Sequence, residues 1–147
     1  WTETQTAGRL LGLELRRYDV RTEDDFDGAF EAIVADRPDA LFTLGDSFLA
    51  RNAQRVAELA ARHRLPGMYE HRAYSDAGGL MSYGTNIAEL WKRSASFVDR
   101  LIKGARVQEM YWDQASYFEL ALNALTAKAQ GITFPPNLLA FATEVIE

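Results

Sequence analysis

The chain has 147 residues, of which 48% are hydrophobic and 25% are charged, the balance of one folded domain of ordinary size. Its 16 Lys and Arg residues against 21 Asp and Glu residues give a net charge of −5, which argues against binding to nucleic acids or to anionic membrane surfaces. Cysteine is absent, so disulfides, thiol catalysis and thiolate metal sites are excluded.

The sequence opens inside a predicted helix. Residues 1–12 run from Trp1 to Gly12, and a glycine suits the position just after the end of a helix. No leader peptide precedes this helix, so we expect the chain to be a fragment or a processed piece of a longer protein.

Strands and helices alternate along the rest of the chain. Short apolar runs between Pro, Gly and polar residues predict strands at residues 13–20, 39–45, 65–69, 80–83 and 117–122. Apolar spacing of three and four, with capping residues, predicts helices at residues 22–37, 48–63, 86–103, 125–130 and from 137 onward. Such alternation is typical of βαβ units with right-handed crossovers, so the sequence predicts a parallel sheet and the α/β fold class.

Polar residues follow three of the predicted strands, at the edge where open α/β sheets bind ligands. They are Asp46 and Ser47, Glu70, and Tyr83 and Gly84. Each loop leads into helical or polar sequence, and the free N–H groups at helix starts point towards the same edge. The combination suits a small zwitterion, with a carboxylate such as Asp46 for an ammonium group and with N–H groups and hydroxyls for a carboxylate.

Each of these residues also has a structural interpretation. Asp46 or Ser47 serves equally well as the N-cap of the next helix, and one residue can do both. Glu70 and the histidine and arginine after it could form a solvated charged loop, the interpretation we favour for those two neighbours. Tyr83 could be an aromatic residue of the core or its rim.

The sequence contains no recognisable catalytic set. His63 and His71 lack the spacing of metal ligands, so we expect no metal ion and no cofactor. Residues 45–49 lack the second glycine of a nucleophile elbow, and residues 78–84 lack both a phosphate-loop lysine and the dinucleotide glycine spacing. The sequence therefore predicts a binding protein rather than an enzyme.

Six stretches of the sequence, which together cover nearly the whole chain, carry a family resemblance. They are residues 39–46, 57–66, 77–86 (Ala-Gly-Gly-Leu-Met-Ser-Tyr-Gly-Thr-Asn), 118–120, 126–132 and 135–139 (Pro-Pro-Asn-Leu-Leu). These stretches resemble the substrate-binding proteins of bacterial ABC importers, in the family that includes tryptophan- and tyrosine-binding members.

The resemblance implies one lobe of a two-lobed binding protein of type I, each lobe a doubly wound, mostly parallel sheet flanked by helices, with a hinge that closes over ligand. Residues 1–147 would be the C-terminal half, with the N-terminal lobe absent. Residues 86–116 would cross to that lobe, and the chain would return near Tyr117.

The same resemblance implies roles for the candidate site residues. Asp46 matches an acidic position suited to the α-amino group of a ligand, and Ser47 lies beside it. Glu70 falls near a polar position after the next strand, and Tyr83 with Gly84 falls at the loop on the hinge side.

The function implied is that of an exported, periplasmic or extracellular membrane-associated component of an ABC importer. It would bind an amino-acid-like ligand, with aromatic amino acids among the candidates, and deliver it to the membrane permease. A ligand-sensing effector or signalling domain of similar fold is the alternative. Without its other lobe the chain is expected to expose apolar surface, to bind ligand weakly and to self-associate.

Overall fold

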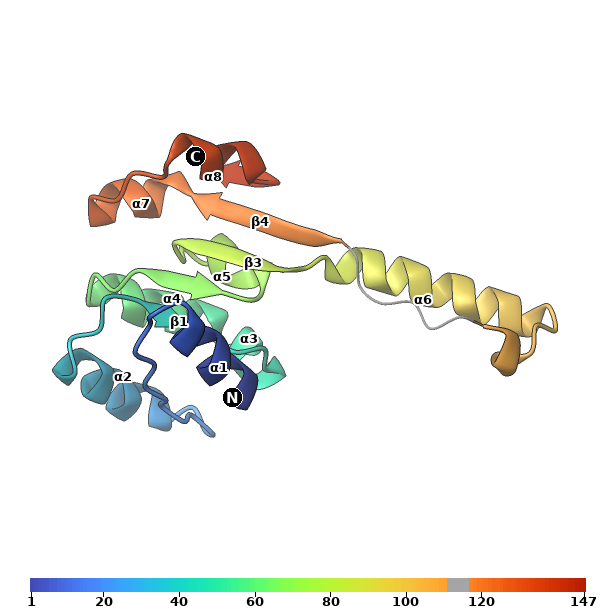
Figure 1. The fold of residues 1–147 in the computed structure, drawn as a ribbon, viewed down its shortest axis with the longest axis horizontal. Helices are drawn as coiled ribbons and strands as arrows, with labels where there is room; N and C mark the ends of the chain where they lie inside the picture. Colours follow the sequence, from blue (N-terminus) through green and yellow to red (C-terminus); the bar gives the residue numbers. More distant parts are fainter. Residues whose placement is uncertain (111–116) are drawn as a thin grey trace. The chain divides into compact units, whose positions relative to one another are not determined.

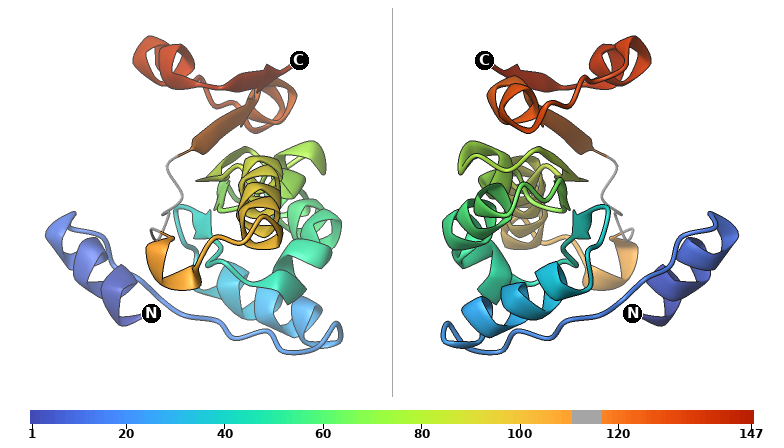
Figure 2. Two further views of the ribbon diagram at one scale, coloured as in Figure 1. Left: turned by 90° about the vertical axis from the view of Figure 1, so that its right-hand side faces the viewer. Right: turned by 90° about the vertical axis from the view of Figure 1, so that its left-hand side faces the viewer.

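The computed structural model describes residues 1–110 and 117–147 and divides into two units, Trp1–Arg37 and Pro38–Glu147. The first unit contains two helices joined by an extended segment (Figure 2). α1 (Thr2–Leu10) is followed by Gly12 at a φ of +70°, which confirms the predicted helix end. α2 (Asp25–Ala35) buries three apolar residues spaced as predicted, namely Phe26, Phe30 and Ile33.

The strand predicted at residues 13–20 is wrong. Within the described parts of the chain this segment pairs with no other strand. Arg16 instead forms an ion pair with Asp36 at 3.0 Å, and Tyr18 donates a hydrogen bond to the same carboxylate. The bonds from Tyr18 and Arg16 hold the pKa of Asp36 below its ordinary value. A strand needs a second backbone to pair with, and an apolar pattern does not reveal whether one is available.

The second unit is built on a sheet in which five strands follow chain order (Figure 1). They are β1 (Leu41–Phe42), β2 (Gly67–Tyr69), β3 (Met81–Thr85), β4 (Phe118–Asn123) and β5 (Glu144–Ile146). The β1–β2, β2–β3 and β4–β5 pairs are parallel, whereas β3 and β4 are antiparallel. The predicted mostly parallel α/β sheet is thereby confirmed, although β5 was not predicted.

The helices of this unit follow the predicted alternation, except that one predicted helix is divided in two and one helix was not predicted. They are α3 (Ser47–Arg51), α4 (Ala53–Arg62), α5 (Arg72–Asp76), α6 (Ile87–Ile102), α7 (Ala124–Gln130) and α8 (Pro136–Phe141), with a 3₁₀ turn at Val107–Glu109. The single helix predicted over residues 48–63 is divided at Asn52, whose side-chain amide donates to the carbonyl oxygen of Phe48 at 3.0 Å. α5 was not predicted.

Helices cover both faces of the sheet, as a doubly wound arrangement requires. On one face Tyr69 of β2 stacks on Tyr74 of α5, with ring centroids 4.5 Å apart. On the other face a core cluster joins strand residues to α7 and the segment after it; its members are Leu80, Leu120, Leu122, Ala127 and Phe134. Leucines at alternate positions of β4 therefore face this cluster, because successive side chains of a strand point to opposite faces.

A buried polar network holds α5 against the sheet. The hydroxyl of Ser75 donates to that of Ser82 at 2.9 Å, and the amide of Asn123 donates to the carbonyl oxygen of Ser75 at 3.1 Å. The Asn123 side chain also accepts from the backbone N–H of Thr126 at 2.9 Å, which caps α7. The Thr126 hydroxyl donates to the carbonyl oxygen of Gly78 at 2.8 Å. These bonds fix the position of α5 relative to β3, β4 and α7.

The charged residues after β2 do not form a solvated loop, so the interpretation favoured for His71 and Arg72 is wrong. His71 is the N-cap of α5, and its Nδ1 accepts from the N–H of Ala73 at 3.1 Å. The Arg72 guanidinium binds both carboxylate oxygens of Glu144 in β5, one of them at 2.8 Å, and lies 3.0 Å from Asp76. Arg72 also holds the pKa of Glu144 below its ordinary value.

α6 begins beyond the end of β3 and continues away from the sheet (Figure 1). Asn86 caps it by accepting from the N–H of Glu89 at 2.9 Å, which confirms the predicted start. None of its residues is buried, and Trp91 and Val98 of the predicted apolar stripe are 72% and 54% exposed. No helix in the described part of the chain has the length and apolar character to span a lipid bilayer. Residues 111–116 of the predicted crossing lie outside the described residues.

Candidate functional site

The candidate site lies at the edge of the sheet where β1 and β2 end. In their parallel registers Phe42 pairs with Met68, and Tyr69 pairs with Ser82. The loops that follow β1 and β2 therefore leave the sheet at the same edge. β3 extends past this point to Thr85, so its last residues lie next to those loops.

Asp46 is exposed and caps α3. Its Oδ1 accepts from the N–H of Phe48 at 2.8 Å and of Leu49 at 3.0 Å, which confirms the cap interpretation. Among the described residues no hydrogen bond reaches Oδ2, so half of the carboxylate remains available to a ligand. Ser47 is the first residue of α3 and is also exposed.

The loops after β1 and β2 and the end of β3 meet around Glu70, and Gly84 permits the closest of these approaches. A Cβ atom built on Gly84 would lie 1.7 Å from the carbonyl oxygen of Glu70, so only glycine permits this approach of β3 to the loop. A Cβ on Gly45 would lie 3.8 Å from Cγ of Glu70, which places the Glu70 side chain over the residue before Asp46. The structure thus brings Asp46, Glu70 and Gly84 to one edge.

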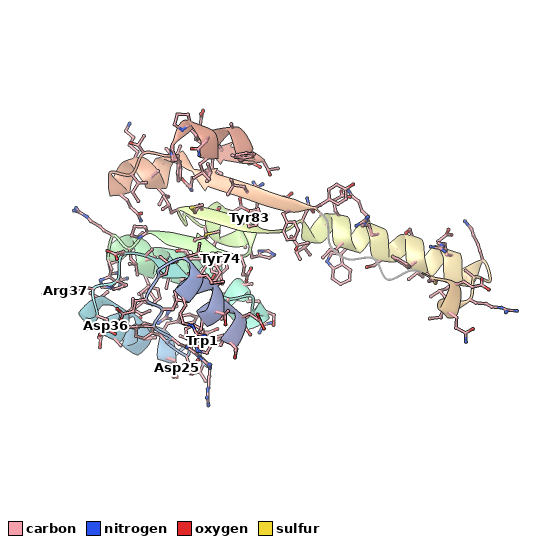
Figure 3. The ribbon with its side chains drawn as sticks, viewed as in Figure 1. Trp1, Asp25, Asp36, Arg37, Tyr74 and Tyr83 are labelled. Carbon is pink, nitrogen blue, oxygen red and sulfur yellow. The ribbon has the colours of Figure 1, made fainter. Side chains whose placement is uncertain are left out.

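Tyr83 lies in β3 next to Gly84, but its ring packs against a residue of β4. Tyr83 (Figure 3) is 49% exposed. Its ring stacks on that of Phe118 in β4, with centroids 5.6 Å apart and planes 18° apart. Its neighbour Ser82 faces α5, so the ring of Tyr83 lies on the opposite face of the sheet. The structure therefore places the backbone of Tyr83 at the candidate edge and pairs its side chain with Phe118.

The sequence reasoning missed two buried hydroxyls near this edge. Tyr74 of α5 (Figure 3) is fully buried, and Thr43, just after β1, is 7% exposed. Within residues 1–110 and 117–147 neither side-chain oxygen has a hydrogen-bond partner of normal geometry. Thr43 was visible as a lone hydroxyl in an apolar run, whereas nothing marked Tyr74, because α5 was not predicted.

The electrostatics of Tyr74 connect it to the candidate carboxylates. Burial raises the pKa of its phenol to about 12, and the nearby charges of Glu70 and Asp46 act in the same direction. The Thr43 hydroxyl lies close enough to lower this pKa, although it falls short of a normal hydrogen bond. The phenol is therefore protonated at neutral pH and can donate a hydrogen bond.

Groups of three or more His, Asp or Glu side chains that could coordinate a metal ion are not found in the described part of the chain. The chemistry on offer at the edge is that of two carboxylates, backbone N–H groups and hydroxyls, which bind and orient a polar molecule.

A family profile and several solved structures match the chain. The profile, described as ABC transporter substrate binding protein, matches residues 3–146. A conserved domain protein from Vibrio cholerae is 22% identical, with a TM-score of 0.88 over 98% of this chain and 48% of that chain. The ABC domain in complex with L-Trp from Streptococcus pneumonia is 21% identical, with a TM-score of 0.85 over 99% of this chain and 50% of that one.

A third structure extends the comparison. It is the ligand-free, open form of a substrate-binding protein with adhesive properties from Clostridium difficile, 17% identical, with a TM-score of 0.71 over 99% of this chain and 48% of that one. No curated protein matches the chain. The chain spans about half the length of each of the three structures, and identities this low establish a shared fold.

Proposed function

Because this chain belongs to the family of ABC transporter substrate-binding proteins, we propose that the protein is the solute-binding component of an importer and that its ligand is an amino acid. It acts outside the cytoplasmic membrane and delivers the ligand to the permease of the importer. The observation that supports this proposal most directly is the meeting of Asp46, Glu70 and Gly84 at one edge of the sheet.

The chemistry of that edge suits the ammonium group of an amino acid. A buried ammonium must be paired and hydrogen-bonded, and an ion pair with a carboxylate meets both needs. Asp46 offers Oδ2, while Glu70 extends from the next loop over Gly45. A ligand that contacts both lobes of the protein stabilises the closed state by its higher affinity for that state, without any bond chemistry.

One comparison favours an aromatic side chain on the ligand. The similar ABC domain from Streptococcus pneumonia was solved in complex with L-Trp.

A thermal-shift screen of the full-length protein against the twenty L-amino acids tests this function. A ligand present at a hundred times its Kd should stabilise the protein by about 2.7 kcal/mol and raise its Tm. L-tryptophan and L-tyrosine are expected to give the largest shifts. Tryptamine and indole-3-propionate, which each lack one of the two charged groups, are the matched controls and should give none. The proposal fails when no amino acid raises Tm, or when the two control compounds raise it equally.

We extend the proposal to the lobes of the protein. Residues 1–147 form the C-terminal half, and residues 86–116 cross to a second lobe, on which the apolar stripe of α6 packs. The exposure of Trp91 and Val98 supports this arrangement, because large apolar side chains in a row are normally covered. The half-length match to the three similar structures supports it as well.

Replacing Trp91 tests whether α6 is covered in the full-length protein. Trp91→Ser should lower the free energy of unfolding by about 3 kcal/mol, the usual cost of truncating a packed tryptophan. Lys92→Ser is the control, since Lys92 is as exposed as Trp91 in this structure and should cost less than about 0.5 kcal/mol. Urea unfolding of both variants measures the difference. Equal, small effects would show that α6 stays exposed.

A further inference from the structure

The start of α6 is bonded to β4 as well as being joined to β3 by the chain. The Asn86 side chain makes two bonds at once: its Oδ1 accepts from the N–H of Glu89 at 2.9 Å, and its amide donates to the carboxylate of Glu119 in β4. The backbone N–H of Asn86 also donates to the carbonyl oxygen of Tyr117 at 3.1 Å. A single residue therefore ties the helix to the strand that runs beside β3.

A cation–π contact attaches the next turns of α6 to the same strand. The guanidinium of Arg93 lies over the ring of Tyr117, 5.4 Å from its centroid. Because Asn86 is bonded to Tyr117 as well, both attachments lie on one side of the helix. We refer to Asn86, Arg93, Tyr117 and Glu119 together as the α6 joint.

The α6 joint is connected to the candidate site through β3. In the register of β3 and β4 Glu119 lies opposite Gly84. Gly84 is also the residue whose backbone approaches the carbonyl oxygen of Glu70 so closely that a Cβ would lie 1.7 Å from it. A continuous set of contacts thus runs from the cap of α6 through Glu119 and Gly84 to the Glu70 loop.

We propose that Asn86 and Glu119 are positioning residues of the ligand site: their hydrogen bond keeps the end of β3 in register with β4. Gly84 then stays against Glu70, and the loop after β2 is held where the ligand needs it. Neither side chain touches the ligand, and the pair acts by reducing the ordering cost of binding. This inference rests on the proposed function, because it concerns the same site.

The test compares three variants of the full-length protein. Glu119→Ala removes the acceptor for Asn86, whereas Glu119→Gln keeps an oxygen that can accept the same bond. Thr143→Val is the matched control: it removes a hydroxyl that accepts from the N–H of Leu120, the next residue of β4, at 3.1 Å and leaves the α6 joint intact. Isothermal titration calorimetry with the twenty L-amino acids, L-tryptophan first, measures Kd. Hydrogen exchange of the ligand-free protein measures the opening of the Asn86 N–H.

Glu119→Ala is expected to weaken amino-acid binding about fivefold, within the range by which single residues of such contact chains change the coupling between sites. Glu119→Gln and Thr143→Val should each change Kd less than about twofold. The loss of one hydrogen bond from β4 alone would therefore not move the affinity. Exchange of the Asn86 N–H should become about tenfold faster in Glu119→Ala and stay unchanged in Thr143→Val.

A double variant that exchanges the two groups separates positioning from a general loss of structure. Asn86→Asp keeps the oxygen that caps α6 but places a second carboxylate against Glu119, so binding should weaken about tenfold. Asn86→Asp together with Glu119→Gln places a carboxylate and an amide together again, and Kd should return to within about twofold of the wild-type value.

Four results would each overturn the inference alone. They are a wild-type Kd in Glu119→Ala, an equal loss of affinity in Thr143→Val, unchanged exchange of the Asn86 N–H in Glu119→Ala, and no recovery of binding in the double variant. Failure of the wild-type protein to bind any amino acid would instead overturn the proposed function and this inference with it.

Discussion

Replacing Asp46 with alanine should weaken amino-acid binding by about 2–5 kcal/mol, which is roughly 30- to 4,000-fold in Kd. The reason is that the ammonium group of the ligand would lose its charged partner and remain desolvated in the closed protein. Calorimetric titration of the full-length protein with L-tryptophan and L-tyrosine measures the change.

Asp46 also caps α3, so the control must separate charge from capping. Asp46→Ser keeps an oxygen that can accept from the N–H groups of Phe48 and Leu49 but removes the charge. Its affinity should fall as far as that of Asp46→Ala, whereas the additional loss of about 1 kcal/mol in folding stability should appear in the alanine variant alone. Wild-type affinity in Asp46→Ser would remove the carboxylate from the site.

Gly84→Ala is expected to damage both stability and binding. The added Cβ would lie 1.7 Å from the carbonyl oxygen of Glu70, so β3 and the loop after β2 would have to separate by more than about 1 Å. We expect a loss of about 3 kcal/mol in the free energy of unfolding, the upper end for overpacking, because the clash is with backbone rather than with a flexible side chain. Urea unfolding measures it.

Gly28→Ala provides the matched control for this change. Gly28 lies in α2, and a Cβ atom built on it meets no other atom within 4 Å, so an added methyl group should stabilise the protein by about 0.5–1 kcal/mol. The two alanine substitutions should therefore shift the urea midpoint in opposite directions. A midpoint for Gly84→Ala at or above that of the wild type would show that β3 does not need its close approach to Glu70.

The fold could be predicted from sequence where a local signal sufficed. The buried faces of α2 and α4 and the start of α6 at Asn86 follow from apolar spacing and capping. Of the strand predicted over residues 39–45, only Leu41–Phe42 forms β1. Pairing could not be predicted in the same way: residues 13–20 alternate but find no partner strand, while β5 is a three-residue strand whose Glu144 is held by Arg72. These outcomes depend on residues far away in the chain.

The candidate site was predictable to a similar degree. Asp46 and Glu70 follow strands, so topology alone indicates that they share an edge. The closeness of Gly84 to Glu70 depends on how far β3 runs past β2, and no local pattern contains that information. Tyr74 was missed because α5 has five residues, too few for a helical period to be recognised in the sequence. The side chain of Tyr74 is nevertheless fully buried in the core.

The antiparallel pairing of β3 with β4 restricts how these two strands can move relative to each other. Five residue pairs, from Met81–Leu122 to Thr85–Phe118, join the two strands into one ribbon. Sliding one strand along the other would break the backbone hydrogen bonds of all five pairs. Bending or twisting both strands together leaves these hydrogen bonds intact. The pairing therefore opposes sliding of β3 along β4 more than bending of the two strands together.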